Sequence, residues 1–341
     1  MHKNCFTTFV CMFTTKIRFI VLLLLMAFMG GVFIHASLTE EDKQQKEFET
    51  YYKIYSLAAP NKLVFAGEVV PLNDFDIQER YDKEILTNVY WQSQTLLMIK
   101  RAYKYFPLVE QILAQHGIPD DMKYLALAES GLQNVVSPAG AAGYWQMLDG
   151  TAKNFGLEIN TEVDERYHIE KSTQAACRYF KEAYAVFNSW ALVAASYNMG
   201  IDGLRKQLQQ QGVNNYYDLL LNTETSRYVF RTLAIKEIME RPSNYGFNVI
   251  NAHKYQQIPT VKVKVTRSIT DLTKYSLDNG CNYKLLKVLN PWLKSKSLTV
   301  PAGKIYYIEL PKYKIVATDL ADKLINDTIE VNNTHIAVGA E

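Results

Sequence analysis

The sequence predicts a mainly α-helical protein that ends in a small α+β module. Residues 75–242 carry apolar side chains at helical spacing, whereas TVKVKVT after Asn251 alternates apolar and polar residues as a half-buried strand does. The chain has 341 residues, of which 48% are hydrophobic. It can therefore bury one sizeable core and a second, smaller one.

Helical signals begin at Phe75 and continue to about Phe106. Gly117-Ile-Pro119-Asp120-Asp121 then predicts a helix start, because proline suits the first turn and the two acids suit the positive end of the helix dipole. The helix that follows, MKYLALAES, is apolar nearly all round and stops at Gly131. Such a pattern is typical of a buried helix.

Three further stretches predict helices before Pro242. KSTQAACRYFKEAYAVF is amphipathic, and SWALVAASYNMG ends at Gly200, where a glycine commonly caps a helix. ETSRYVFRTLAIKEIMERP runs from Glu224 and is stopped by Pro242. Together these stretches predict one helical domain.

The C-terminal module is predicted to run strand, helix, helix, strand. After TVKVKVT come ITDLTKYSLDNG and NYKLLKVLN, two short helices that end near Gly280 and Pro291. KIYYIELP supplies the last strand. This βααβ order within about 50 residues fits the lower end of domain sizes.

The N-terminal stretch KIRFIVLLLLMAFMGGVFIHA places two basic residues before an apolar run and a small-residue end. It predicts a signal peptide and export, with a retained membrane anchor as the alternative. The expected divisions are a leader or anchor over 1–36, a polar tether over 37–74, the helical domain over 75–247, the small module over 258–312, and an unassigned tail over 313–341.

Charge and cysteine content narrow the class of protein. The 37 Lys and Arg against 35 Asp and Glu leave a formal charge of +2 without a basic run, so we expect no nucleic-acid partner. Cys177 and Cys281 fall in separate modules and form neither a metal-site pattern nor a disulfide framework. We predict a buried free thiol for Cys177, and no metal or other cofactor.

The stretch ALAESGLQNVVSPAGAAGYWQM contains an unexpected carboxylate. Met122, Leu125 and Ala126 lie at helical spacing, and the next position on that apolar stripe is Glu129. A glutamate in an apolar site should have a raised pKa and hold a proton near neutral pH, so it could act as an acid and then as a base. The alternative is a solvent-facing residue at a frayed helix end. Ser130, the small-residue loop and Tyr144-Trp145-Gln146 favour a site for a polyhydroxyl ligand.

Three ordered motifs carry a resemblance to a known family. The first runs from Glu129-Ser130 through SPAGAAGYWQM; the second is Ala195-Ser-Tyr197-Asn198-Met-Gly200; the third is Glu224-Thr225-Ser-Arg227-Tyr228-Val229. Their order and spacing resemble the soluble lytic transglycosylase domain. The segment from Pro71 onward also resembles the membrane-bound lytic murein transglycosylase D type. Together with the apolar N-terminal stretch, this family resemblance implies the bacterial periplasm or cell envelope as the location.

The resemblance implies a lysozyme-like helical fold and cleavage of the β-1,4 bond between N-acetylmuramic acid and N-acetylglucosamine in peptidoglycan. It implies that Glu129 protonates the glycosidic oxygen and then takes the proton of the muramoyl C6 hydroxyl, giving a 1,6-anhydro end with help from the N-acetyl group. Asp149 and Asp164 are the nearest downstream acids, and nothing indicates that either lies across a cleft. A hydrolysing muramidase and a non-catalytic wall-binding protein are the alternatives.

The same resemblance implies substrate contacts, for which the expected residues are Ser130, Ser137, Gln146, Met147, Tyr197, Asn198 and Tyr228. Four of these residues also have a purely structural explanation: a helix-ending turn for Tyr197-Asn198, the helix core for Tyr228 and a helix cap for Ser130. Trp145 is expected in the core. The family's Asp-x-Arg-x-Asp reads Asp164-Glu-Arg166-Tyr-His168 here, which leaves His168 as a surface or hydrogen-bonding residue.

Residues 260–311 resemble a LysM domain, a module that binds glycans containing N-acetylglucosamine. Asn290-Pro-Trp292-Leu and Gly303-Lys304 carry the likeness, whereas the usual Gly-Asp-Thr-Leu is absent. Asn290 and Trp292 are the expected glycan contacts. The alternative is a small module that docks on the helical domain.

Overall fold

The structure is a computed structural model that describes Met26, residues 40–51 and residues 53–313. Two compact units divide the chain, Met1–Ser56 and Leu57–Glu341. In the first, part of the predicted polar tether forms α2 (Glu40–Tyr51). The predicted leader lies outside the described residues except for Met26. None of the helices in the described ranges combines the length and apolar character that crossing a bilayer requires.

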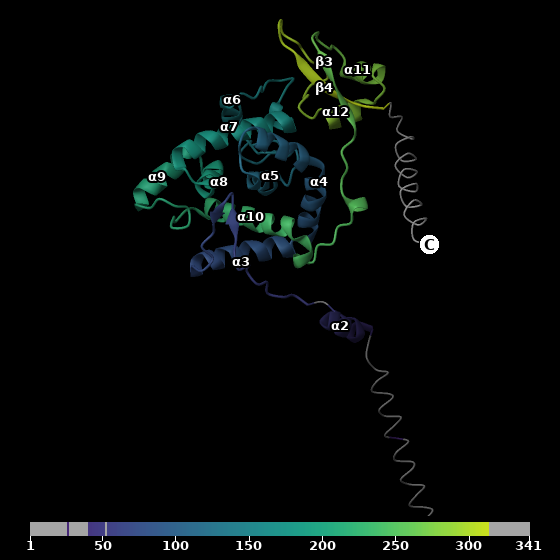
Figure 1. The fold of residues 1–341 in the computed structure, drawn as a ribbon. Helices are drawn as coiled ribbons and strands as arrows, with labels where there is room; N and C mark the ends of the chain where they lie inside the picture. The colour runs from purple at the N-terminus through teal and green to yellow at the C-terminus, as the bar shows by residue number, and fades with distance from the viewer. Residues whose placement is uncertain (1–25, 27–39, 52, 314–341) are drawn as a thin grey trace, which may run out of the picture. The chain divides into compact units, whose positions relative to one another are not determined.

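Eight α-helices build the main body of the second unit among the described residues (Figure 1). They are α3 (Phe75–Tyr90), α4 (Gln92–Gln115), α5 (Lys123–Ser130), α6 (Asp149–Asn154), α7 (Ile169–Phe187), α8 (Trp190–Met199), α9 (Ile201–Gln211) and α10 (Thr223–Glu240). Helix α10 packs against α3, α5 and α8, and α4 packs against α5 and α7. The short α5 is therefore enclosed by longer helices, and the predicted mainly helical fold is confirmed.

The first helical stretch differs from its prediction. The sequence pattern runs without interruption from Phe75 to about Phe106, but the chain breaks at Trp91, whose ψ of 55° is not helical. Helix α4 then continues past Pro107 to Gln115. The exposed Pro107 forfeits one backbone hydrogen bond without ending the helix, since buried residues on either side of it hold the helix in the core.

Helix α5 follows its prediction closely. Leu125 and Ala126 are fully buried, as the apolar pattern requires. The helix ends at Gly131, which adopts a left-handed φ of 58° and donates its N–H to the Leu127 carbonyl at 2.9 Å. Glu129 therefore lies in the last turn of a buried helix.

A short hairpin precedes the helices. It consists of β1 (Val64–Phe65) and β2 (Glu68–Val69), which the sequence patterns did not indicate. The Glu68 carboxylate accepts hydrogen bonds from Ser189 Oγ at 3.0 Å and from the Ala191 N–H at 3.1 Å. It thus stabilises the positive end of α8 from a distant part of the chain.

The C-terminal module has the predicted βααβ order. It contains β3 (Thr260–Val265), α11 (Leu272–Asp278), α12 (Tyr283–Leu289) and β4 (Tyr306–Pro311). The two strands pair antiparallel, from Thr260 opposite Pro311 to Val265 opposite Tyr306. Asp271 and Asn282 cap the two helices with their side chains.

This module docks on the loop that precedes α7. Backbone bonds join Asp164 N to the Trp292 carbonyl at 2.9 Å and Lys294 N to the Glu162 carbonyl at 2.7 Å. Tyr306 donates its hydroxyl to Glu158 at 2.9 Å. The module's core also includes buried residues of the helical part, among them Val163. The module is therefore docked on the helical part through backbone and side-chain hydrogen bonds.

Candidate active site

Glu129 meets a tyrosine from another helix. The Tyr228 hydroxyl on α10 donates to Glu129 Oε1 at 2.7 Å. Tyr228 is 1% exposed, while Glu129 keeps part of its surface open to solvent. Across the described residues no cation forms an ion pair with Glu129. A carboxyl group with a neutral hydrogen-bond partner and no ion pair can exchange a proton with a bound ligand.

Burial raises the pKa of Glu129 from 4.5 to about 7, which confirms the elevated value predicted from its apolar surroundings. Two smaller effects oppose burial, the hydrogen bond from Tyr228 and the positive charge of Arg231. The negative charge of Glu224 acts in the same direction as burial. Near neutral pH the group is therefore poised between its protonated and ionised forms.

Arg231 and Glu224 are neighbours of the site that the sequence reasoning missed. Arg231 Nη2 donates to Glu224 Oε1 at 2.7 Å, and its guanidinium carbon lies 5.7 Å from the centre of the Tyr228 ring. Its Nε is buried without a hydrogen-bond partner. Positions 224, 228 and 231 recur at the spacing of one helix face, a signal that could have identified both residues once Tyr228 was assigned to the site.

Tyr197 and Asn198 lie at the end of α8, just before Gly200. The Tyr197 hydroxyl donates to the Trp145 carbonyl at 2.7 Å, and the charge of Glu129 contributes to raising the pKa of Tyr197. Asn198 Oδ1 accepts a hydrogen bond from Thr225 Oγ1 at 2.8 Å. These residues therefore close the helix, as the structural alternative holds, and Tyr197 also lies within the electrostatic reach of Glu129.

The small-residue loop after α5 is braced by its own polar side chains. Ser130 Oγ donates to the Tyr144 carbonyl at 2.7 Å, and Ser137 Oγ accepts the Ala141 N–H at 3.1 Å. Gln146 Nε2 donates to the carbonyls of Val135 at 2.9 Å and Gly143 at 2.8 Å. Ser130, Ser137 and Gln146, three of the expected substrate contacts, thus form hydrogen bonds that stabilise the conformation of the loop.

Other residues of the loop belong to the core. Trp145 is fully buried and donates its indole N–H to Thr173 Oγ1 at 2.9 Å, so its predicted place in the core is confirmed. Met147 is 3% exposed and packs in the same core. A Cβ atom at Gly143 would lie 1.9 Å from the Arg166 carbonyl oxygen, and its φ is 81°. Close packing therefore requires this glycine.

The two acids noted downstream of Glu129 are engaged elsewhere. Asp149 pairs with Lys153 at 2.8 Å, and Asp164 pairs with Arg166 at 2.7 Å. Within the described ranges, no group of three or more His, Cys, Asp or Glu side chains is placed to hold a metal ion. Cys177 and Cys281 are buried free thiols, as predicted for Cys177.

The expected glycan contacts of the C-terminal module are buried. Trp292 is 3% exposed and stacks between His168 and Tyr306, with ring centres 5.8 Å apart in both pairs. Asn290 is fully buried; its side chain donates to the Glu309 carbonyl at 2.7 Å and accepts the Glu309 N–H at 2.7 Å. Asn290 therefore stabilises the module internally, and Trp292 contacts the helical part through His168. Burial lowers the pKa of His168 to about 4.

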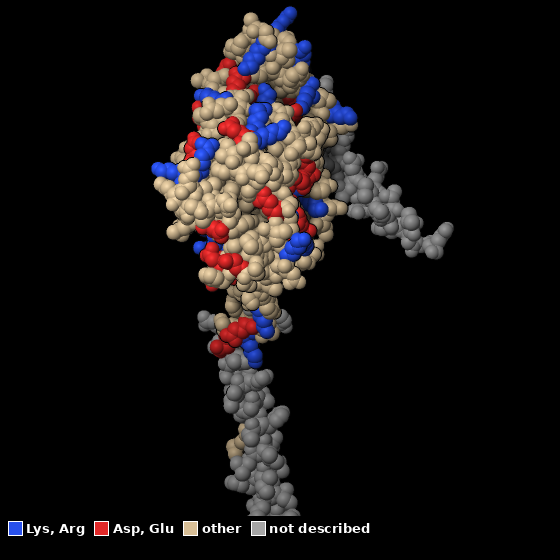
Figure 2. Space-filling view, turned by 60° about the vertical axis from the view of Figure 1, so that its left-hand side comes forward, with Lys and Arg blue, Asp and Glu red and all other residues tan. Residues whose placement is uncertain are grey.

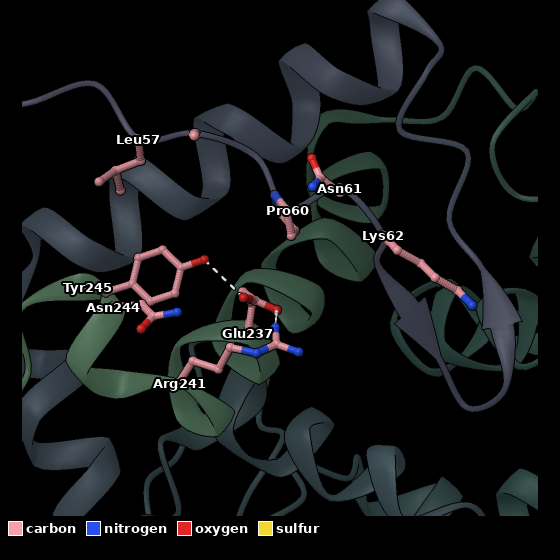
Figure 3. Close-up of a pocket in the computed structure, with 9 residues that line it drawn as sticks. Leu57, Pro60, Asn61, Lys62, Glu237, Arg241, Asn244 and Tyr245 are labelled. Carbon is pink, nitrogen blue, oxygen red and sulfur yellow. Dashed lines mark hydrogen bonds and ion pairs between the residues drawn. The ribbon is translucent and has the colours of Figure 1, made fainter.

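A separate cavity lies at the end of α10 (Figure 3). It has a volume of about 460 Å³ and lies between the segment that starts at Leu57 and the helix end. Glu237 faces it, paired with Arg241 and accepting the Tyr245 hydroxyl at 3.1 Å (Figure 3). None of the predicted site residues lines this cavity, and the Glu237 carboxylate in it is paired with Arg241.

Comparison with protein families gives two matches. A model described as the transglycosylase SLT domain matches residues 109–220. A second, described as the soluble lytic transglycosylase C-terminal LysM-like domain, matches residues 261–314. The first match includes Glu129, and the second covers the βααβ module. The two predicted resemblances are thereby confirmed.

Among curated proteins, the chain is similar to membrane-bound lytic murein transglycosylase D of Escherichia coli K12. The two are 26% identical over 249 residues, which cover 71% of this chain and 53% of the relative. The chain therefore spans about half the length of the curated protein that it matches.

Among solved structures, similar chains include the 70 kDa soluble lytic transglycosylase of Escherichia coli, with 23% identity and a TM-score of 0.35 over 41% of this chain and 24% of that one. Another is an inactive mutant of lytic transglycosylase Slt from Pseudomonas aeruginosa, with 18% identity and a TM-score of 0.33 over 44% of this chain and 26% of that one.

Proposed function

We propose that this chain, which contains a transglycosylase SLT domain followed by a LysM-like C-terminal domain, is a lytic transglycosylase of peptidoglycan. The bond cleaved would be the β-1,4 link from N-acetylmuramic acid to N-acetylglucosamine. Glu129 would serve first as the acid and then as the base.

In the first step, protonated Glu129 gives its proton to the glycosidic oxygen, and the bond from that oxygen to the muramoyl C1 breaks. The substrate's N-acetyl group helps to hold the positive charge at C1. In the second step, ionised Glu129 takes the proton of the C6 hydroxyl as its oxygen bonds to C1. The products are an N-acetylglucosamine 4-hydroxyl and a 1,6-anhydro end, and no water is consumed.

The observation that carries this proposal is the state of Glu129. Its pKa of about 7 lets one carboxyl group donate a proton and take one back near neutral pH. Its hydrogen-bond partner is the neutral Tyr228, which holds the carboxyl group in place without fixing it in the ionised form. An activity–pH profile should therefore fall above neutrality as Glu129 loses its proton.

Digestion of purified sacculi tests the catalytic assignment. Glu129→Gln keeps the size of the side chain and can still accept the Tyr228 hydrogen bond, but it cannot carry the proton. We expect muropeptide release to fall by about 10²- to 10⁴-fold, the usual contribution of a general acid. Equal release from the wild type and the variant would contradict the assignment. Anhydro ends resist reduction by borohydride, so the products identify the reaction.

A hydrolysing muramidase is the second candidate, and Glu224 is the residue that favours it. Hydrolytic glycosidases use two carboxylates about 5–10 Å apart, and Glu224 raises the pKa of Glu129 by its charge. Its carboxylate is nevertheless already paired with Arg231.

Glu224→Gln separates the two reactions. If the enzyme is lytic, the variant keeps most of its activity and still releases anhydro ends. The loss of the negative charge lowers the pKa of Glu129, so the falling limb of the profile moves to lower pH. Loss of about 10³-fold in turnover, together with reducible ends from the wild type, would instead support hydrolysis.

We also propose that the protein acts in the cell envelope. The apolar N-terminal stretch supports export, with membrane attachment as the alternative. The similarity to a membrane-bound murein transglycosylase agrees with that location. Mass spectrometry of the mature N-terminus would distinguish a cleaved leader from a retained anchor. The proposed domain limits are 75–247 for the catalytic part and 258–312 for the LysM-like module.

A further inference from the structure

A groove runs between the helical part and the C-terminal module. It has a volume of about 760 Å³ and is lined by α4, by the loop after α5 and by α12. Four cations line it, Arg101 and Lys104 from α4, and Lys284 and Lys287 from α12. No Asp or Glu is among its lining residues. Two sequence-distant helices thus bring like charges together around one open space.

These cations lack acidic partners. In the described part of the chain, none of the four forms an ion pair with a carboxylate. Burial lowers the pKa of Arg101 and of Lys287, and the nearby charge of Lys294 lowers that of Lys287 further. Two buried polar atoms without partners, Arg101 Nη2 and Asn134 Oδ1, also belong to residues that line the groove. The unpartnered Arg101 Nη2 is a donor that an anion would satisfy, whereas Asn134 Oδ1 is an acceptor and needs a donor. Lys287 Nζ donates to the carbonyls of Leu293 and Ser295, and its charge is not balanced by a carboxylate.

The position of Arg101 connects the groove to the catalytic carboxyl group. Arg101 Nε donates to the Gly131 carbonyl at 2.6 Å, only two residues beyond Glu129. Arg101 is therefore fixed at the C-terminal end of α5. The groove therefore borders the end of the helix that carries Glu129.

The neighbouring cavity provides an internal contrast. It shares Lys104 with the groove but contains two acids, Glu170 and Glu309. Glu170 pairs with Lys262, and Glu309 accepts the Thr260 hydroxyl at 3.1 Å. The neighbouring cavity thus contains one ion pair and a second acid, whereas the lining of the groove contains neither.

The whole C-terminal module also carries an excess of positive charge. Residues 258–312 contain ten Lys and Arg but only three Asp and Glu, although the full chain has a formal charge of only +2. In Figure 2, blue atoms lie over this module at the top of the view, with fewer red atoms among them. A cationic surface of this kind attracts an anionic polymer.

We propose that the groove binds the carboxylates of the stem peptide carried by the muramoyl residue of the substrate. This inference rests on the proposed function, because it concerns the same glycan strand. A strand without stem peptides keeps one lactyl carboxylate on each muramoyl residue, whereas an attached stem peptide supplies several carboxylates beside the scissile bond. Lysine and arginine bind such groups by charge-assisted hydrogen bonds.

The test compares two charge reversals within one module. Lys284→Glu changes an exposed residue of the groove, and Lys296→Glu makes the same change at an exposed residue that does not line it. Both are made in the full-length Glu129→Gln protein so that no substrate is consumed. Dissociation constants are measured by calorimetry for soluble uncrosslinked strands that carry stem peptides and for the same strands stripped by an amidase.

We expect Lys284→Glu to weaken binding of the peptide-bearing strands by about three- to tenfold. Lys296→Glu should leave that binding within about twofold. Stripped strands keep a lactyl carboxylate on each muramoyl residue, so Lys284→Glu should weaken their binding by less than it weakens binding of the peptide-bearing strands. Equal loss for both variants would mean general attraction by charge, and equal loss on both polymers would mean glycan recognition; either result overturns the proposal. If the chain binds neither polymer, the proposed function fails as well, whereas binding both with equal affinity overturns the groove alone.

Discussion

Two neighbouring residues of α10 bind two carboxylates from other helices, one through a charged guanidinium group and the other through a neutral hydroxyl. Arg227 binds Glu84 of α3, with Nε 2.5 Å from Oε1 and Nη2 3.4 Å from Oε2. Tyr228, the next residue, binds Glu129 of α5 through a neutral hydroxyl. One carboxylate receives a cation and the other does not.

The other buried acids follow the pattern of Glu84. Asp164 pairs with Arg166, Glu165 with Lys171, and Glu237 with Arg241. Each of these buried carboxylates has a cation that offsets part of the cost of burying its charge. Glu129 has no such cation, so burial raises its pKa. The comparison separates acids that serve the fold from the one that is free to exchange a proton.

The largest effect on stability should come from Glu129 itself. Its pKa is about 7 in the folded state and about 4.3 in an unfolded chain, so folding disfavours the ionised form and stability falls as pH rises between these values. Glu129→Gln removes that penalty. The variant should be more stable than the wild type by about 3 to 4 kcal/mol at pH 8 and equal to it near pH 4, as measured by urea denaturation. Equal stability at both pH values would contradict the account.

The matched change at Glu84 should act in the opposite direction. Glu84 is 1% exposed and holds α3 against α10 through Arg227, so Glu84→Gln should cost about 1 to 3 kcal/mol of stability at pH 7. The same denaturation experiment measures it. The pH profile of activity should not move, because Glu84 does not affect the pKa of Glu129. A shift in the pH profile of activity would show that Glu84 also influences the titration of Glu129, contrary to this prediction.

The smallest change tests Tyr228. Its hydroxyl lowers the pKa of Glu129 by hydrogen bonding to it, so Tyr228→Phe should raise that pKa and move the falling limb of the activity profile to higher pH. Tyr228→Phe also leaves the aromatic packing in place. A limb that moves to lower pH, or does not move, would show that the hydroxyl does not act on Glu129.

Local signals in the sequence were enough to predict the setting of Glu129. The apolar run of α5, the stop at Gly131 and the caps of the C-terminal helices depend on residues close together in the chain, where spacing and backbone preference decide the structure. Tyr228 lies 99 residues away, and only the family resemblance connected it with Glu129.

Tertiary contacts explain what the sequence did not reveal. Ser130 and Gln146 form hydrogen bonds to backbone carbonyls of the loop, and no pattern of residue types predicts which carbonyl will lie within reach. The break at Trp91 and the passage of α4 through Pro107 likewise depend on packing that overrides local preference. The same applies to Trp292, which the LysM resemblance made an expected glycan contact but whose ring stacks on His168.

The central claim is that Glu129 holds a proton near neutral pH because it lacks a cation. A carbon-13 NMR titration of the Glu129 carboxyl carbon, assigned with the Glu129→Gln variant, tests it most directly. The account predicts a midpoint at about 7. A midpoint at or below the ordinary glutamate value of about 4.3 would contradict it.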